Sequence, residues 1–160
     1  MPNPLDPNSY EYGRLLDISR AEYSNGWQVD SLWNPGKSIQ VRPNYVDVPI
    51  LIGSEPGSSL KLTFNGKAVG IAVAAGSDAG MIDYRIDKGD WQQMNLFTDW
   101  SMHLHLPWYY TLDGDLAHEN HLLEIKVSRS KDERSEGYAC RIKYFYVNGL
   151  VKKEGISSLF

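Results

Sequence analysis

Apolar residues alternate with polar or small ones through much of this chain. The pattern is clear in segments 60–64, 69–74, 82–86 and 123–127. Because successive side chains of a β-strand point to opposite faces, a period of two predicts strands with one buried face. The run 138–147, rich in β-branched and aromatic residues, predicts a longer strand near the end of the chain. No helical stripe of comparable length occurs.

Turn signals fit the same plan. Asn65-Gly66 lies between two alternating runs and predicts a hairpin with a type I′ turn, which needs positive φ at both central residues. Residues 87–90 predict a second hairpin, with its glycine at the left-handed position. Further short apolar runs lie near Ile18, Trp27, Ile39 and Ile50. With about nine or ten strands and turns at about 8–12-residue spacing, the sequence predicts an all-β fold, an antiparallel β-sandwich of the jelly-roll type.

The chain is expected to hold one domain. We predict a linker and a first edge strand in residues 1–22, the β-sandwich module in residues 23–150 and a tail in residues 151–160. A chain of 160 residues can bury about 70% of its unfolded surface in one core without a disulfide or metal. Three prolines within residues 2–7 are typical of an interdomain linker, because proline fixes φ and lacks a backbone donor. The charged segment 130–137 predicts an exposed loop before the last strand.

Charge and composition argue against several partners. The net charge is −4, and the 16 Lys and Arg residues are scattered rather than gathered in a stripe. We therefore expect neither nucleic acid nor a membrane as partner. No run of about 18 apolar residues and no signal-peptide pattern occurs, so either the protein is cytosolic or a targeting signal lies upstream of this segment. The linker-like start favours the second. The single cysteine, Cys140, lies in an alternating run and is interpreted as a core residue.

Catalytic motifs are missing from the sequence. A serine hydrolase needs a nucleophile on a sharp turn, with an imidazole and an oxyanion hole in reach, yet neither G-x-S-x-G nor G-D-S occurs. Gly76-Ser77-Asp78 contains the residues of G-D-S in a different order. We interpret it as a loop between strands. There is also no phosphate-binding loop and no spaced cysteine cluster. The sequence therefore predicts a chain without catalytic residues and without a cofactor.

All four histidines lie between His103 and His121. On a strand, His103 and His105 would share one face, as metal ligands do, while His118 and His121 flank a polar turn. A transition-metal site also needs a third firm ligand and hydrogen-bonded surroundings, and the pattern supplies neither. We interpret the histidines as surface or structural residues and predict no metal site.

Aromatic residues give the main candidate for function. Residues 70–110 hold three of the five tryptophans. Trp27 and Trp91 are expected to pack in the core or across strands. In contrast, Trp100, Trp108 and Tyr109 lie in irregular polar and aromatic segments, and binding residues concentrate in loops on a rigid scaffold.

The predicted ligand site combines these rings with nearby polar groups. A sugar presents an apolar C–H face and a rim of hydroxyls, which suits flat rings beside hydrogen-bonding side chains. We predict that Trp100, Trp108 and Tyr109 stack on sugar and that Asp99, His103 and His105 bond its hydroxyls. The alternative is that the same rings are buried in the core or against another domain.

Several strings of the sequence resemble a known module. They are VGIAVAAGSDAG (69–80), IDYRID (82–87), Asp90-Trp91, LFTDWS (96–101), LHLPWY (104–109) and CRIKYF (140–145). Together they resemble the β-sandwich module that follows the catalytic domain in bacterial SGNH (GDSL-type) hydrolases, notably from Bacteroides-like organisms. The resemblance covers about residues 26–148, and residues 2–12 are similar to the connector after the last catalytic block.

The resemblance implies an accessory half of a larger enzyme. The parent enzymes are esterases that act on acylated glycans, and their catalytic Ser, Asp and His have no counterpart here. An upstream hydrolase domain is thus the implied partner, with a periplasmic or secreted parent protein. The resulting hypothesis is a non-catalytic module that binds carbohydrate or positions substrate. Its alternatives are a structural module docked on the hydrolase domain, or one that contributes a wall of the active site.

Overall fold

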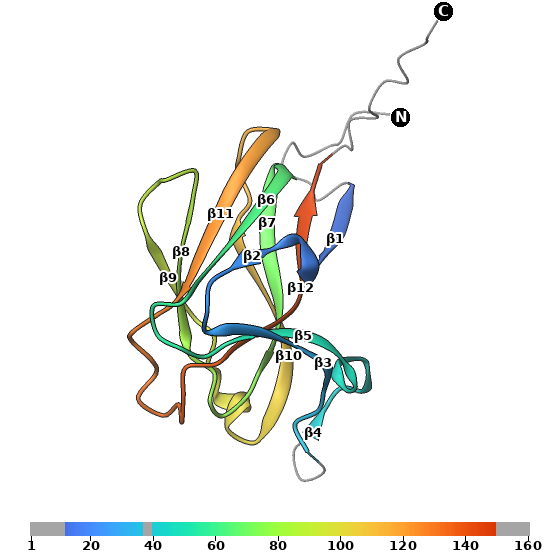
Figure 1. Ribbon diagram of the computed structural model, residues 1–160, viewed down its shortest axis with the longest axis vertical. Helices are drawn as coiled ribbons and strands as arrows, with labels where there is room; N and C mark the ends of the chain where they lie inside the picture. Colours follow the sequence, from blue (N-terminus) through green and yellow to red (C-terminus); the bar gives the residue numbers. More distant parts are fainter. Residues whose placement is uncertain (1–11, 37–39, 150–160) are drawn as a thin grey trace, which may run out of the picture.

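The computed structural model describes residues 12–36 and 40–149, and its strands form two packed sheets (Figure 1). The strands are β1 (Gly13–Asp17), β2 (Glu22–Tyr23), β3 (Trp27–Trp33), β4 (Gln40–Val41), β5 (Val48–Gly53), β6 (Ser59–Gly66), β7 (Ala68–Ala75), β8 (Met81–Ile86), β9 (Gln92–Asn95), β10 (Leu104–Asp113), β11 (Glu119–Val127) and β12 (Cys140–Asn148). Short 3₁₀ helices are η1 (Ile18–Arg20), η2 (Pro43–Tyr45) and η3 (Asp99–Met102).

The larger sheet has the order β3-β5-β12-β7-β10-β4, with β1 also paired to β12, and the smaller sheet has the order β2-β6-β11-β8-β9. In Figure 1, β8 and β9 lie on the left, while β1 and β12 run side by side on the right. This arrangement confirms the predicted all-β sandwich. The strands named above pair antiparallel, apart from β4 and β10, which run parallel over two residue pairs.

The main core lies between the two sheets. Its buried side chains come from alternate positions of the paired strands, among them Leu62, Ile71, Ile82, Ile125 and Phe145. The predicted core position of Cys140 is confirmed, because its side chain is fully buried. Trp27 also lies in this core.

Strand β7 is buried on both faces, unlike the strands of the smaller sheet. Val69, Ile71 and Val73 face the core, while small residues occupy the opposite face. A second buried cluster, made of Trp33, Tyr45, Ile50 and Ala74, covers part of that opposite face. The outer face of the larger sheet therefore has its own packed layer.

One predicted hairpin is wrong. Strands β6 and β7, which flank Asn65-Gly66, belong to different sheets, so the chain crosses between layers at this point. Gly66 has φ 157°, and a Cβ there would lie 1.9 Å from the carbonyl oxygen of Asn148. Close approach of the neighbouring backbone, rather than a type I′ turn, explains this glycine.

The second predicted hairpin is present between β8 and β9. Its turn closes with a bond from the Gly89 amide to the Ile86 carbonyl, 2.9 Å long. Asp87 (φ 51°) and Lys88 (φ 63°) take the left-handed positions, rather than the glycine. Aspartate tolerates this conformation because its side chain can bond nearby amides, and Asp87 Oδ1 accepts from the Leu122 amide at 2.8 Å.

Other predicted segments can be placed on this fold. Gly13–Asp17 forms β1, a strand within the predicted 1–22 segment, and the predicted 130–137 loop lies between β11 and β12. The predicted strand residue Ile39, the prolines of the linker and the 151–160 tail lie outside the described residues.

Candidate functional site

The six residues that the sequence singled out do not share one surface. Trp108 and Tyr109 are neighbours on β10, so their side chains point to opposite faces of the sheet. Trp108 is registered with Val73, which faces the core, and Tyr109 is registered with Ala72 on the outer face. Trp100 lies in η3 and is 70% exposed. The three rings therefore cannot stack together on one sugar in this structure.

The polar residues of the predicted site differ in exposure, because Asp99 and His103 are exposed and His105 is buried. Asp99 is exposed and accepts a bond from Arg134, whose guanidinium also bonds Asp132. His103 is exposed at the end of η3. That helix is fixed by a capping box, in which Thr98 and Ser101 bond each other's backbone amides.

His105 of β10 is buried, with only 7% of its surface exposed. The ring packs edge-on against Trp33 with centroids 5.2 Å apart, and neither ring nitrogen has a hydrogen-bond partner among the described residues. Burial first, and then the charge of Arg141, lower the pKa of His105 despite the opposing charge of Asp78. The imidazole is therefore neutral and covered, which does not suit direct bonding to a ligand hydroxyl.

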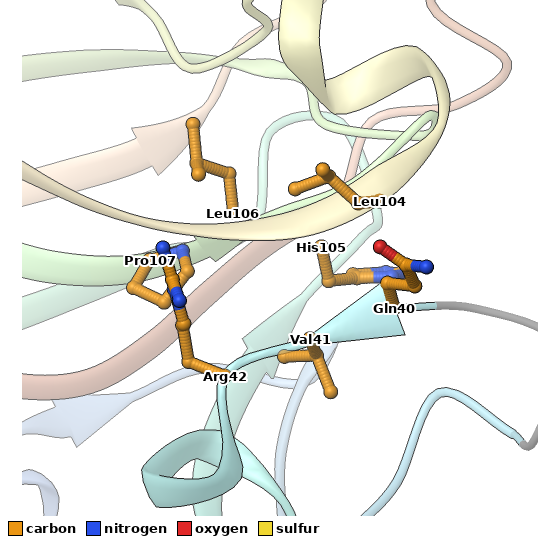
Figure 2. A pocket seen from close by; sticks show the side chains of 7 residues that line it. All are labelled: Gln40, Val41, Arg42, Leu104, His105, Leu106 and Pro107. Carbon is orange, nitrogen blue, oxygen red and sulfur yellow. The ribbon is translucent and has the colours of Figure 1, made fainter.

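A small pocket adjoins this histidine. Its volume is about 240 Å³, and its walls are Gln40, Val41, Arg42, Leu104, His105, Leu106 and Pro107 (Figure 2). The walls come from β4, the start of β10 and the residue after β4, where the short parallel pairing occurs. Most of the lining is apolar, with one cationic side chain.

The outer face of the larger sheet carries a more extended set of aromatic side chains. Tyr109 and Thr111 of β10 and Tyr144 and Tyr146 of β12 lie on this face, and we call these four residues the tyrosine surface. Tyr144 and Tyr109 are both registered with Ala72, while Tyr146 and Thr111 are both registered with Gly70. Two rows of side chains thus run across three neighbouring strands.

The small residues of β7 leave room for these rings to pack flat and close to the sheet. A Cβ on Gly70 would lie 2.1 Å from Cζ of Tyr146, so the phenol end of that ring occupies the space above the glycine. The centroid of Tyr109 lies 6.2 Å from the centroids of both Tyr144 and Tyr146. The three rings therefore form one contiguous group, in which Tyr109 is 54% exposed.

Hydrogen bonds fix the outer ends of the rings. The hydroxyls of Tyr109 and Tyr144 are 2.7 Å apart, and the hydroxyls of Thr111 and Tyr146 are 2.9 Å apart. Burial and the neighbouring Tyr109 hydroxyl raise the pKa of Tyr144 to about 12. Burial likewise raises the pKa of Tyr45, which packs against the same pair. The Tyr144 and Tyr45 hydroxyls therefore stay neutral at ordinary pH. A neutral hydroxyl can both donate and accept hydrogen bonds.

Sequence reasoning found only Tyr109 of the four residues in the tyrosine surface. The sequence did not show that Tyr144 lies beside Tyr109, because the two residues are 35 positions apart in the chain. A register shift between Ile142 and Tyr144 also interrupts the simple alternation of β12. The available signal was the outer row of β7, Gly70, Ala72 and Ala74, whose small side chains leave room for large neighbours.

No group of three or more His, Cys, Asp or Glu side chains lies close enough to hold a metal ion in residues 12–36 and 40–149. Within the same ranges, no helix has the length and apolar character needed to cross a membrane.

Comparison with known proteins finds similar structures but no similar sequence family. No protein-family profile matches the sequence, and no curated protein matches it. A two-domain esterase (CEX) active on acetylated mannans is similar in structure, with a TM-score of 0.66 and 13% identity over 94% of this chain and 40% of that one. The chain thus spans about two fifths of the length of that esterase.

Two binding modules are similar over nearly their whole length. A family 35 carbohydrate binding module from Clostridium thermocellum has a TM-score of 0.55, with 11% identity over 84% of this chain and 95% of that one. The C-terminal CBM6 of LamC from Zobellia galactanivorans has a TM-score of 0.56, with 11% identity over 86% of this chain and 99% of that one. This chain therefore has a β-sandwich fold similar to the folds of these two modules and of part of the two-domain esterase.

Proposed function

We propose that this chain is a non-catalytic module that binds carbohydrate on the tyrosine surface. The observation that carries the proposal is the contiguous group of three tyrosine rings and four hydroxyls on one open face. Tyrosine combines apolar ring area with a polar tip, so it can pack on the C–H face of a sugar and bond its hydroxyls.

In this proposal the module belongs to a secreted or periplasmic enzyme of the SGNH (GDSL) type. It holds an acylated glycan near an upstream esterase domain, or contributes a wall to that domain's active site. Support comes from the sequence strings between residues 26 and 148 and from the likeness in fold to an esterase active on acetylated mannans.

Docking on a catalytic domain is the second function, and it uses a different region. Trp100 and Met102 of η3 are both exposed, and exposed apolar side chains of this kind mark interaction surfaces. Trp108, also partly exposed on β10, is a further candidate for that contact. In this proposal the tyrosine surface holds the glycan and η3 faces the enzyme.

Affinity electrophoresis of the full chain tests carbohydrate binding. Gels are cast with acetylated mannan, xylan, β-1,3-glucan or galactan, and the migration of the protein is compared with that in a blank gel. We expect retardation by at least one polysaccharide. Tyr109→Ala should remove most of it, because this variant deletes the most exposed ring of the surface.

Two matched variants separate the alternatives. Trp91→Ala removes an aromatic side chain from the other sheet and should leave retardation unchanged. Trp100→Ala should also leave it unchanged, but should weaken association with a separately produced catalytic domain. Loss of retardation in Trp100→Ala with retention in Tyr109→Ala would contradict the assignment of the tyrosine surface.

A further inference from the structure

Strand β12 changes its partner on one edge. Residues Cys140, Arg141 and Ile142 pair with β5, while Tyr144 to Asn148 pair with β1. Lys143 lies at the change, where the register with β7 also shifts. Because β1 and β5 follow each other along the same edge of β12, the sheet has a gap between them.

This gap is a groove that joins the tyrosine surface. Its volume is about 410 Å³, and its lining residues are Leu15, Leu16, Asp17, Ile18, Val48, Pro49, Lys143 and Tyr144. Tyr144 lines the groove and also belongs to the tyrosine surface, so the two are continuous. Figure 1 shows that β1 and β5 approach β12 at different heights, which is the origin of the opening.

The charges in the groove are already engaged within the protein. The ammonium of Lys143 donates to the carbonyl of Asn44 and lies 4.4 Å from the centroid of Tyr45. Asp17 accepts from the Ser19 amide at 2.9 Å, and its bonds to Ser19 lower the pKa of the carboxyl. One charge of each sign, each with its own partner, favours a ligand without net charge.

The combined surface is longer than one sugar ring. It crosses four neighbouring strands, β10, β7, β12 and β1, in the row Tyr109, Ala72, Tyr144 and Asp17. Strands in a sheet lie about 4.8 Å apart, so the row spans about 14 Å. The surface is open at the Tyr109 end, where the ring is exposed, and continues into the groove at the other end.

We propose that the tyrosine surface and the groove form one site for several consecutive units of an extended, neutral glycan chain. The chain lies across the strands, with rings on Tyr109 and Tyr144 and its continuation between β1 and β5. This inference rests on the proposed carbohydrate binding and adds the class of ligand. Affinity must then rise with the number of sugar units, because each unit covers further apolar surface.

Calorimetric titration with oligosaccharide ladders tests the inference. The probes are manno-, cello-, xylo- and laminari-oligosaccharides of one to six units, titrated into the full chain. We expect no detectable binding of monosaccharides and an affinity that increases at least tenfold between the disaccharide and the hexasaccharide of one ladder. Equal affinity for short and long members would overturn the inference and leave carbohydrate binding intact. Absence of binding in every ladder would overturn both.

A variant pair locates the long-chain contribution. Leu15, 66% exposed, lines the groove, and Leu32, 70% exposed, lies on β3 outside it. Leu15→Ser should lower affinity for the hexasaccharide about fivefold while leaving the disaccharide unchanged, and Leu32→Ser should change neither. Equal behaviour of the two variants would contradict a role for the groove.

Charge selectivity gives an independent check. Hexagalacturonate, a chain with a carboxylate on every unit, should bind more weakly than the preferred neutral hexasaccharide. Tighter binding of the acidic hexamer than of every neutral one would overturn the assignment of a neutral ligand.

Discussion

The outer faces of the two sheets use aromatic side chains in opposite ways. On the smaller sheet, Trp91 lies under two cations, with Arg85 at 4.6 Å and Lys126 at 4.1 Å from its ring. Glu124 completes this charged surface by bonding Arg85 at 2.6 Å. On the larger sheet, the rings of Tyr109, Tyr144 and Tyr146 lie next to one another over glycine and alanine, and Tyr109 is exposed.

This difference shows that an exposed ring is available to a ligand only when its neighbours leave it uncovered. Two cations already lie over the ring of Trp91. In contrast, the hydroxyls of Tyr109 and Tyr144 bond each other at the ends of their rings. The larger sheet also buries a second apolar cluster on its outer face. Substitutions on the two faces should therefore have effects of very different size.

The largest effect should come from Tyr45, the buried ring beside the tyrosine surface. Tyr45→Ala should lower the free energy of unfolding by about 3 to 5 kcal/mol, because it leaves a large cavity beside Trp33 and Ile50. Trp91→Ala, a matched variant on the other face, should lower it by about 1 kcal/mol, because it mainly loses solvent-exposed cation–π contacts. Urea denaturation measures both. Equal losses would remove the contrast between the faces.

The next effect concerns binding rather than stability. Gly70→Ala places a methyl group where the Tyr146 ring lies and should tilt that ring out of the row. We expect affinity for the preferred oligosaccharide to fall about tenfold, which corresponds to about 1.4 kcal/mol. Stability should change by less than about 1 kcal/mol, since the flexible ring can move and alanine suits a strand better than glycine. Unchanged affinity would show that the Tyr146 ring does not contact the glycan.

The smaller sheet should respond more strongly to pH than the tyrosine surface. His121 is buried, its Nδ1 lies 2.5 Å from Asp87 Oδ2, and its Nε2 lies 2.8 Å from the Ala117 carbonyl. Burial alone would lower the pKa of His121, but these bonds to Ala117 and Asp87 outweigh it and raise the pKa. Burial alone would raise the pKa of Asp87, but its bonds to His121 and Leu122 lower it.

These shifts define a pH window. The raised pKa of His121 stabilises the fold fully below about pH 6.5, its unfolded value, and this contribution is lost as pH rises through the folded pKa. The lowered pKa of Asp87 stabilises the fold above about pH 3.9, and this contribution is lost as pH falls through the folded pKa. Asp87→Asn retains the turn and should cost about 1 kcal/mol near pH 6. Thermal melts from pH 4 to 9 should show a flatter profile for the variant, and an unchanged profile would contradict this role.

The smallest effect should come from the surface ion pairs. Glu124→Gln removes the partner of Arg85 and Lys61 and should cost less than about 1 kcal/mol, because water screens such pairs. The difference from the parent chain should vanish in 1 M salt, and glycan affinity should not change. A loss that persisted in high salt would indicate packing rather than charge.

The individual strands could be predicted from sequence, because burial of one face imposes a local period of two. Segments 60–64, 82–86 and 123–127 alternate and form β6, β8 and β11. Which strands pair depends on distant residues. Asn65-Gly66 therefore suggested a hairpin, although the chain crosses between sheets there to meet Asn148.

The candidate site was less accessible from sequence for the same reason. Trp108 and Tyr109 are adjacent in the chain and lie on opposite faces, whereas Tyr109 and Tyr144 are distant in the chain and touch. Composition indicated that the aromatic residues matter, but not which of them lie side by side. The antiparallel register of β10, β7 and β12 determines which rings are neighbours.

The position of β12 also constrains the order of folding. This strand pairs with β1, β5 and β7, all of which lie much earlier in the chain. During synthesis these three strands therefore keep open edges until residues 140–148 leave the ribosome. A truncation before Cys140 would leave those edges unprotected and prone to aggregation.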